Sequence, residues 1–340
     1  MSAHPGKPGR YYLISYPRTA SNLLLKILAL DSQPNFSSGE VDGGYFFMPA
    51  DDILIEPRIR ARSIGDWTAD ERAQVKESFQ ACFEAQQQWL EATESQGRSV
   101  FVKEHTVFFA DPTARSDLQF GPSPTREPAW TVEYAGGSTH SKLNITVLPD
   151  EFLLTWLPTF LIRHPALAFP SLYRTVIKRE GKESAAADNF ASLLTTVEWS
   201  RSLYDFYVQN RESLPCSPDQ SLEWPMILDA DDIIAHPATV ALYCNKIGMD
   251  PRKLCFHWDQ FKSEELSQIE PNQLAMRMSL YQSTGIDTSK SSRGINVDDE
   301  ASKWRSEFGI AVGDHIEKLV RGAMADYEYL RARRLRADRG

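Results

Sequence analysis

Polar or charged side chains follow four short apolar runs of the chain. They are Ser15, the group Lys103-Glu104-His105, the pair Arg163-His164, and Asp229. Such runs are typical of buried strands, and in an α/β fold ligands bind at the carboxyl ends of the strands. Basic side chains at that edge favour an anionic ligand. The four groups are therefore predicted to converge on one site.

The first run leads into a sequence that suits an anion. Residues 11–15 indicate a strand, Pro17 and Arg18 a tight turn, and residues 21–30 a helix with Ser21 and Asn22 in its first turn. The free N–H groups at such a helix N-terminus bind phosphate. The loop lacks the leading glycine and the lysine of GxxxxGK[ST], so it is not the loop of a nucleotide triphosphatase. Taken alone, it fits a phosphate site and an ordinary strand–turn–helix equally well.

Strand and helix patterns alternate along the chain, which predicts an α/β fold with a mainly parallel central sheet flanked by helices. Further strands are expected at 99–105, 159–165 and 224–233, and helices at 68–95, 188–209, 236–248 and 312–333. Thr68 and Glu71 form a capping box for the first of these helices. No linker divides the chain, so we expect a single domain over 1–340, with a turn-rich excursion or lid at about 107–150.

Composition excludes several classes of protein. The chain has 340 residues, 42% of them hydrophobic, and its net charge of −9 argues against a nucleic-acid binder. The four cysteines form no CxxC pair, which excludes a typical zinc site or disulfide framework, and no credible set of metal ligands is found. The apolar stretch 152–162 is too short to span a bilayer, and no signal peptide precedes the first strand. We expect a cytoplasmic protein with no membrane partner.

Four motifs together resemble the sulfotransferase superfamily, whose members use 3′-phosphoadenosine 5′-phosphosulfate (PAPS). They occur in family order over roughly residues 11–310. The motifs are "SYPRTASNLL", which matches the family's Tyr-Pro-Lys/Arg-Ser-Gly-Thr-Thr loop; "VKEH", which matches Lys-x-His; Arg163 with Ser171 eight residues later; and "SRGINVDDEASKWRSEF", with Arg293, Gly294 and Trp304.

The resemblance implies a P-loop-type three-layer sandwich, as in sulfotransferases, and a role for each matched residue. Thr19, Ala20, Ser21 and Asn22 would hold the 5′-phosphate, with Leu23 at the position of a tryptophan that stacks on adenine. Arg18 and Lys103 would neutralise charge on the leaving phosphate, and His105 would be the general base. Arg163, Ser171, Arg293 and Gly294 would hold the 3′-phosphate. PAPS would be the co-substrate and adenosine 3′,5′-bisphosphate the product, with no metal.

The predicted reaction is transfer of the sulfuryl group to a hydroxyl of a small, apolar acceptor by in-line displacement. The acceptor would be a specialised compound of secondary metabolism, and a homodimer is left open. His164 is expected to be structural, and Asp229, Asp231 and Asp232 to cap a helix or form salt bridges rather than bind magnesium.

Three residues differ from the family pattern and keep an alternative open. Ala20 replaces a glycine, Leu23 a tryptophan and Ala230 a tyrosine. If residue 20 needs a positive φ, its Cβ costs about 1 kcal/mol or more. The alternative is a sulfotransferase-fold protein that has lost or changed the transfer reaction, as a nucleotide-binding protein or a repurposed enzyme. An ATP-dependent kinase is a third reading, disfavoured because the loop lacks the nucleotide-binding lysine.

Overall fold

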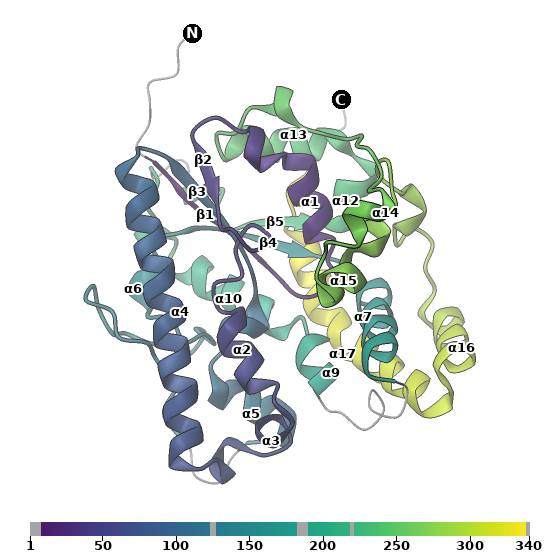
Figure 1. Ribbon diagram of the computed structural model, residues 1–340, viewed down its shortest axis with the longest axis horizontal. Coiled ribbons are helices and arrows are strands. Elements are labelled where there is room, and N and C mark those ends of the chain that lie inside the picture. The colour runs from purple at the N-terminus through teal and green to yellow at the C-terminus, as the bar shows by residue number, and fades with distance from the viewer. Residues whose placement is uncertain (1–7, 123–126, 182–189, 218–220, 338–340) are drawn as a thin grey trace. The chain divides into compact units, whose positions relative to one another are not determined.

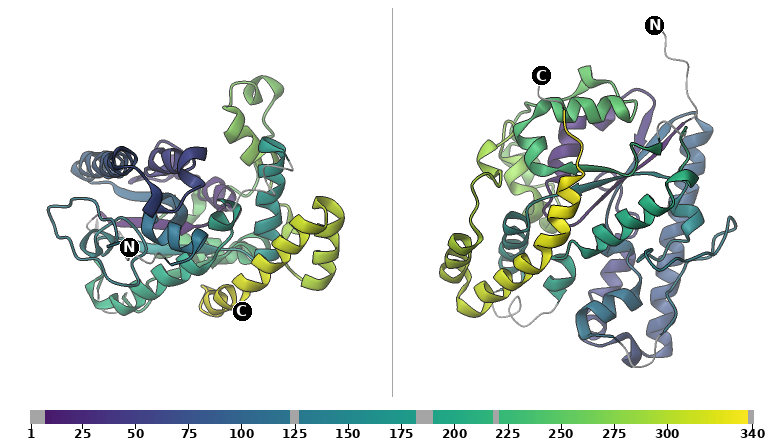
Figure 2. Two further views of the ribbon diagram at one scale, coloured as in Figure 1. Left: turned by 90° about the horizontal axis from the view of Figure 1, so that it is seen from below. Right: turned by 180° about the vertical axis from the view of Figure 1, so that it is seen from behind.

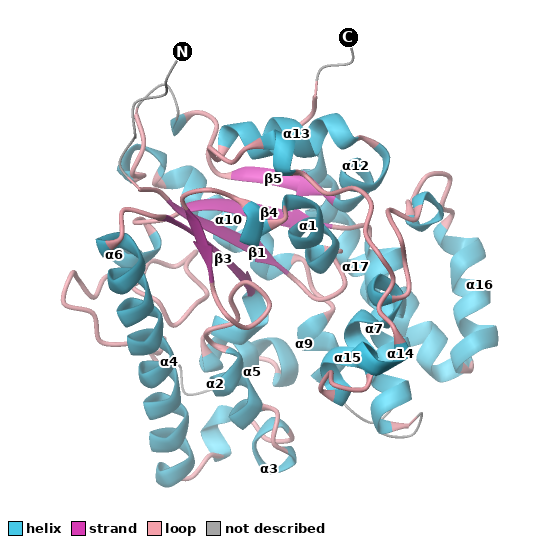
Figure 3. Cartoon of the chain, turned by 45° about the horizontal axis from the view of Figure 1, so that its top comes forward, coloured by secondary structure: helices cyan, strands magenta, loops and turns pink. Residues whose placement is uncertain are grey.

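The computed structural model describes residues 8–122, 127–181, 190–217 and 221–337. They form an α/β fold with a five-stranded parallel sheet, so the predicted fold class is confirmed (Figures 1 and 3). The strand order is β2-β3-β1-β4-β5. The strands are β1 (Arg10–Ser15), β2 (Phe36–Ser38), β3 (Ser99–His105), β4 (Leu157–Ile162) and β5 (Met226–Asp229).

The chain divides into two compact units. Unit 1 comprises residues 1–16, 35–160 and 192–226, and unit 2 comprises residues 17–34, 161–191 and 227–340. The prediction of a single domain stays a prediction.

Unit 1 is built on the parallel pairing of β1 with β3, in which Arg10 lies opposite Val100 and Ser15 opposite His105. Its helices are α2 (Met48–Leu54), α3 (Pro57–Arg60), η2 (Ile64–Asp66), α4 (Ala69–Ser95), η3 (Thr106–Phe109), α5 (Pro112–Phe120), α6 (Asp150–Leu153), α10 (Glu198–Gln209) and η4 (Arg211–Ser213). Helix α9 (Phe190–Leu194) begins in unit 2 and ends in unit 1. The predicted capping box of α4 is confirmed, because Thr68 Oγ1 accepts from the Glu71 N–H and the Glu71 carboxylate accepts from the Thr68 N–H.

Much of the predicted excursion packs within unit 1. Trp130, Val132, Val147 and Leu148 are buried, and Ala110 forms an isolated bridge with Thr146. The buried amide of Asn144 donates to the Leu148 carbonyl at 2.7 Å and to Asp150 at 2.8 Å. The described part of this segment therefore contributes to the core of unit 1. Residues 123–126 lie outside the described residues.

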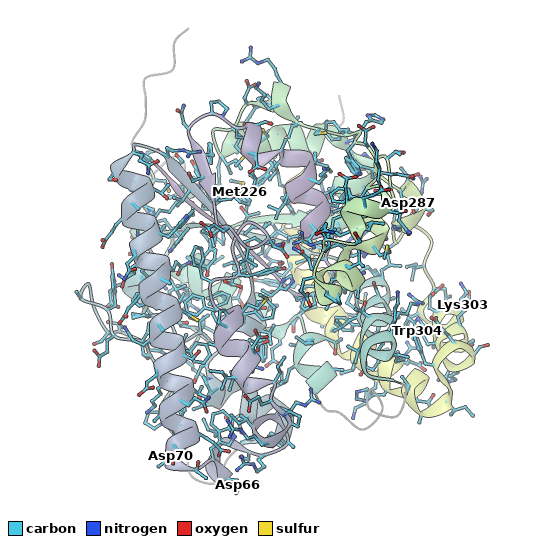
Figure 4. All side chains as sticks on the ribbon, viewed as in Figure 1. Asp66, Asp70, Met226, Asp287, Lys303 and Trp304 are labelled. Atoms are coloured by element: carbon cyan, nitrogen blue, oxygen red, sulfur yellow. The ribbon has the colours of Figure 1, made fainter. Side chains whose placement is uncertain are left out.

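Unit 2 carries the helix that follows β1 and the C-terminal helices. Its helices are α1 (Ser21–Leu28), η1 (Leu30–Ser32), α7 (Pro165–Glu180), α12 (Ala230–Ala235), α13 (Pro237–Lys246), η5 (Pro251–Lys253), α14 (Ser263–Leu266), α15 (Pro271–Tyr281), η6 (Thr288–Lys290), α16 (Val297–Phe308) and α17 (Ile310–Ala332). Helices α16 and α17 pack side by side (Figure 2). Trp304 of the fourth motif lies on α16 and is only 1% exposed (Figure 4). It therefore contributes to packing.

Three predicted boundaries differ from the structure. The strand expected at 224–233 ends at Asp229, because the Asp229 carboxylate accepts from the Asp231 N–H at 3.0 Å and caps α12. The strand expected at 159–165 is β4, which ends at Ile162. The helix expected at 188–209 is two helices, α9 and α10, and its first residues, 188–189, lie outside the described residues. Within the described ranges, no helix combines the length and the apolar character needed to cross a membrane.

The loop before α1 has an unusual backbone. Arg18 has a φ of 69°, and Ala20, the N-cap of α1, has a φ of 66° and a ψ of 25°. Left-handed conformations at non-glycine residues cost about 1 kcal/mol or more and are found at functional sites. The chain thus keeps at Ala20 the left-handed geometry that a glycine would adopt more easily.

We predict that Ala20→Gly stabilises unit 2. Glycine removes the steric cost of the Cβ at a positive φ and is also a better N-cap than alanine. The expected gain in the free energy of unfolding is up to about 1 kcal/mol, measured by urea denaturation.

Ala81→Gly is the matched control, because Ala81 is an exposed residue inside α4. The same change there should cost about 1 kcal/mol. A loss at position 20 equal to the loss at position 81 would contradict a left-handed Ala20.

Candidate active site

The predicted site residues fall into two groups, one in each unit. Lys103 and His105, at the end of β3, belong to unit 1. The loop 18–23, Arg163, Ser171, Arg293 and Gly294 belong to unit 2. Each group has its own local geometry.

His105 is held by the register of β1 and β3. Because Ser15 lies opposite His105 in that pairing, its Oγ comes within 2.9 Å of His105 Nδ1. The Ser15 hydroxyl donates its single proton to the Glu104 carbonyl, at 3.4 Å. Its oxygen must then accept from His105, which puts the imidazole proton on Nδ1. This pattern fits the neutral tautomer of His105 with the proton on Nδ1 and the lone pair on Nε2.

Tyr45 contacts the other ring nitrogen of His105. Its Oη lies 2.8 Å from His105 Nε2, and both residues are only 8% exposed. With the lone pair on Nε2, the Tyr45 hydroxyl is the donor. The edge of the Phe108 ring also packs on Tyr45, at 5.2 Å between centroids. The site thus holds a histidine between two hydroxyl groups.

Lys103 and Glu104 are both fully buried beside His105. Burial lowers the pKa of the Lys103 ammonium to about 7, a shift that Glu104 partly opposes. Burial also raises the pKa of the Glu104 carboxyl well above its ordinary value. Lys103 Nζ lies 4.2 Å from the centroid of the Tyr45 ring, within cation–π distance. Lys103 can therefore change its charge near neutral pH, next to His105.

In unit 2, three of the predicted residues meet at the N-terminus of α1. Arg18 Nε donates to Ser171 Oγ at 3.0 Å, and Arg163 Nη1 donates to the Arg18 carbonyl at 3.0 Å. Arg18 Nη1 also donates to the carbonyl of Met276 in α15, at 2.6 Å. Two guanidinium groups and a hydroxyl thus lie close to the N-terminus of a helix, which is a donor set for phosphate.

The other predicted residues of unit 2 differ in how exposed they are. Thr19 and Ser21 are buried, whereas Ala20, Asn22 and Leu23 are half-buried. Arg163 Nη2 donates to the carbonyl of Lys290, at 3.1 Å, close in sequence to Arg293. Arg293 is exposed, and Gly294 follows it with a φ of 79°. Their binding roles stay predictions.

The residues expected to be structural do have structural contacts. His164 caps α7, because its Nδ1 accepts from the Ala166 N–H at 3.1 Å. Asp231 accepts from the Ser292 N–H at 2.9 Å, and Asp232 pairs with Arg334 at 2.6 Å. The capping role of His164 and the salt-bridging role of Asp232 are confirmed, whereas Asp231 is an acceptor for the Ser292 backbone. Among the residues that the structure describes, no three His, Cys, Asp or Glu side chains are grouped as metal ligands.

Sequence reasoning assigned no role in catalysis to Ser15 or Tyr45. Ser15 was visible as a polar residue at a strand end, but its partner on β3 depends on the register. Tyr45 follows two glycines in "DGGY", a signal for a tight backbone approach. That signal does not reveal which side chain Tyr45 would contact.

Comparisons with known proteins identify the family. No family model matches the chain. The sulfotransferase domain of the olefin synthase of Synechococcus PCC 7002 is 15% identical to the chain, with a TM-score of 0.36, over 85% of this chain and 89% of that domain. Sulfotransferase ppzF of Metarhizium majus (strain ARSEF 297) is 91% identical over 340 residues, which cover 99% of this chain and 100% of that protein. This identity over the full length shows that the chain belongs to the sulfotransferases and is an enzyme of that family.

Proposed function

We propose that the enzyme transfers the sulfuryl group of PAPS to a hydroxyl of a small, apolar acceptor, with His105 as general base. The observation that carries the proposal is the hydrogen-bonding pattern of His105. In the tautomer that this pattern fits, the Ser15 oxygen accepts a hydrogen bond from His105 Nδ1–H, and the Nε2 lone pair is the basic site. A general base must be neutral and carry a lone pair, and this tautomer has its lone pair on Nε2, where it accepts from Tyr45.

The donor set of unit 2 supports PAPS as the co-substrate. The left-handed residues Arg18 and Ala20 turn the backbone just before α1, a geometry typical of loops that bind anions through N–H groups. Arg163 and Ser171 supply charge and hydroxyl donors suited to a second phosphate. A nucleotide with phosphates at both the 3′ and the 5′ position would use both groups of donors.

In the proposed reaction, the acceptor oxygen forms a bond to sulfur while the bond from sulfur to the 5′-phosphate oxygen breaks. The acceptor proton ends on His105 Nε2, and adenosine 3′,5′-bisphosphate leaves with the bonding electron pair. Arg18 and Lys103 would stabilise the charge that develops on the leaving oxygen. The aromatic rings of Tyr45 and Phe108 beside His105 support an apolar acceptor.

The unpaired state of Cys82, Cys216, Cys244 and Cys255 supports a cytoplasmic location.

We predict that His105→Ala and Arg163→Ala fail in different ways. Loss of the base should lower the rate of transfer by about 10²–10⁴-fold and leave nucleotide affinity nearly unchanged. Loss of Arg163 removes a charged donor, so the affinity for adenosine 3′,5′-bisphosphate should fall roughly tenfold or more. Calorimetric titration gives the affinities, and release of labelled sulfate from PAPS gives the rates.

Arg174→Ala is the control for loss of an arginine. Arg174 also lies on α7 but is half-exposed and pairs with Glu307 at 2.7 Å. Its loss should leave both affinity and rate unchanged. Equal loss of nucleotide affinity in the His105 and Arg163 variants would refute the division of roles.

A further inference from the structure

The backbone fixes Tyr45 tightly against β3. The Lys103 N–H donates to the Gly43 carbonyl at 2.9 Å, and the Tyr45 N–H donates to the Lys103 carbonyl at 2.9 Å. Between them, Gly44 passes so close to β3 that a Cβ there would overlap the Lys103 carbonyl oxygen. Only glycine therefore fits at position 44. The two hydrogen bonds to Lys103 hold residues 43–45 against β3.

Tyr45 itself adopts a strained conformation. Its φ is 57°, in a region that bulky side chains rarely occupy. Such strain persists only where surrounding contacts hold it, and it is concentrated at active sites. Here the contacts are those of Gly43 and Gly44 with Lys103. In this conformation, the phenol oxygen of Tyr45 lies within hydrogen-bond distance of His105 Nε2.

This contact changes the route by which a proton reaches His105. The basic atom of the proposed mechanism is Nε2, which lies 2.8 Å from Tyr45 Oη. In the tautomer with the proton on Nδ1, the Tyr45 hydroxyl is the donor to Nε2. A phenol oxygen that donates one proton can also accept another. A proton can therefore arrive at Tyr45 Oη while the phenolic proton passes on to Nε2.

We propose that Tyr45 relays the acceptor proton to His105 during sulfuryl transfer, an inference that rests on the proposed function. As the bond between the acceptor oxygen and sulfur forms, the acceptor proton moves to Tyr45 Oη and the phenolic proton moves to His105 Nε2. The bond between sulfur and the 5′-phosphate oxygen breaks, and that oxygen keeps the electron pair. Tyr45 ends neutral and His105 ends as an imidazolium whose Nδ1 proton faces Ser15.

Lys103 is placed to assist the relay. Its Nζ lies 4.2 Å from the centroid of the Tyr45 ring. A cation over that ring stabilises negative charge that builds on the phenol oxygen as its proton departs. Phe108 packs on the same ring through its edge and holds it in place.

The first test needs no acceptor. In protein with ¹⁵N-labelled histidine, His105→Ala identifies the His105 signals among those of the seven histidines. The relay requires a proton on Nδ1 and a hydrogen-bonded, unprotonated Nε2. Tyr45→Phe should shift the Nε2 signal and leave the Nδ1 proton in place. A proton on Nε2, or an Nε2 signal that Tyr45→Phe does not change, would overturn the relay.

The second test uses water as the acceptor and measures sulfate release from PAPS in a single turnover. Tyr45→Phe keeps the ring and removes only the hydroxyl, so the rate should fall by about 10²-fold or more. Binding of adenosine 3′,5′-bisphosphate should stay unchanged, which also shows that the variant is folded. Because the two residues act in series, the double variant should be no slower than His105→Ala alone.

Tyr11→Phe is the matched control, since Tyr11 is a tyrosine of β1 whose ring packs on Phe36 and Trp224. It should retain the wild-type rate. If the wild type releases sulfate and Tyr45→Phe is equally fast, the relay is wrong and the proposed function stands. If the wild type releases none, the proposed function fails and the relay fails with it, whatever the histidine signals show.

Discussion

The parallel register of β1 with β3 is the constraint on which the candidate site depends. It sets Ser15 opposite His105 and brings the Ser15 hydroxyl within hydrogen-bond distance of the imidazole Nδ1. Because successive side chains of a strand point to opposite faces, a slip of one residue would separate this pair. The buried apolar residues Leu13 and Ile14 of β1 and Val100 to Val102 of β3 hold the register. The chemistry at the strand end thus rests on hydrophobic packing along the strands.

Several residues at or near the predicted site residues have a strained backbone or a buried ionisable group. Arg18, Ala20 and Tyr45 all have positive φ, and Lys103 and Glu104 are ionisable groups with no exposed surface. Each of these features destabilises the folded state by itself. All five lie at or beside residues that we propose to bind the donor nucleotide or to act in catalysis. A loss of stability at such residues is expected where function requires it.

The sequence predicted most of the elements, because their signals are local. The capping box of Thr68 and Glu71 marked the start of α4. The helix predicted at 236–248 is α13, with Pro237 as its first residue. The end of β5 was missed, since Ile233 continues an apolar pattern although Asp229 caps a new helix. The contact of Arg18 with Ser171 was not predicted, because the resemblance assigned these residues to different phosphate groups. The contact of Arg18 with Met276, 258 positions away, is a long-range contact with no local sequence signal.

The most direct test of the account is which nucleotide stabilises the enzyme. Melting temperatures would be compared with adenosine 3′,5′-bisphosphate, with ADP, and with ATP plus magnesium. A ligand that binds only the folded state at 100 times its Kd adds about 2.7 kcal/mol to the free energy of unfolding. The account predicts a rise of several degrees with the 3′,5′-bisphosphate and a much smaller rise with ADP. A response to ATP with magnesium alone, or no response to any of the three, would contradict PAPS as the sulfuryl donor.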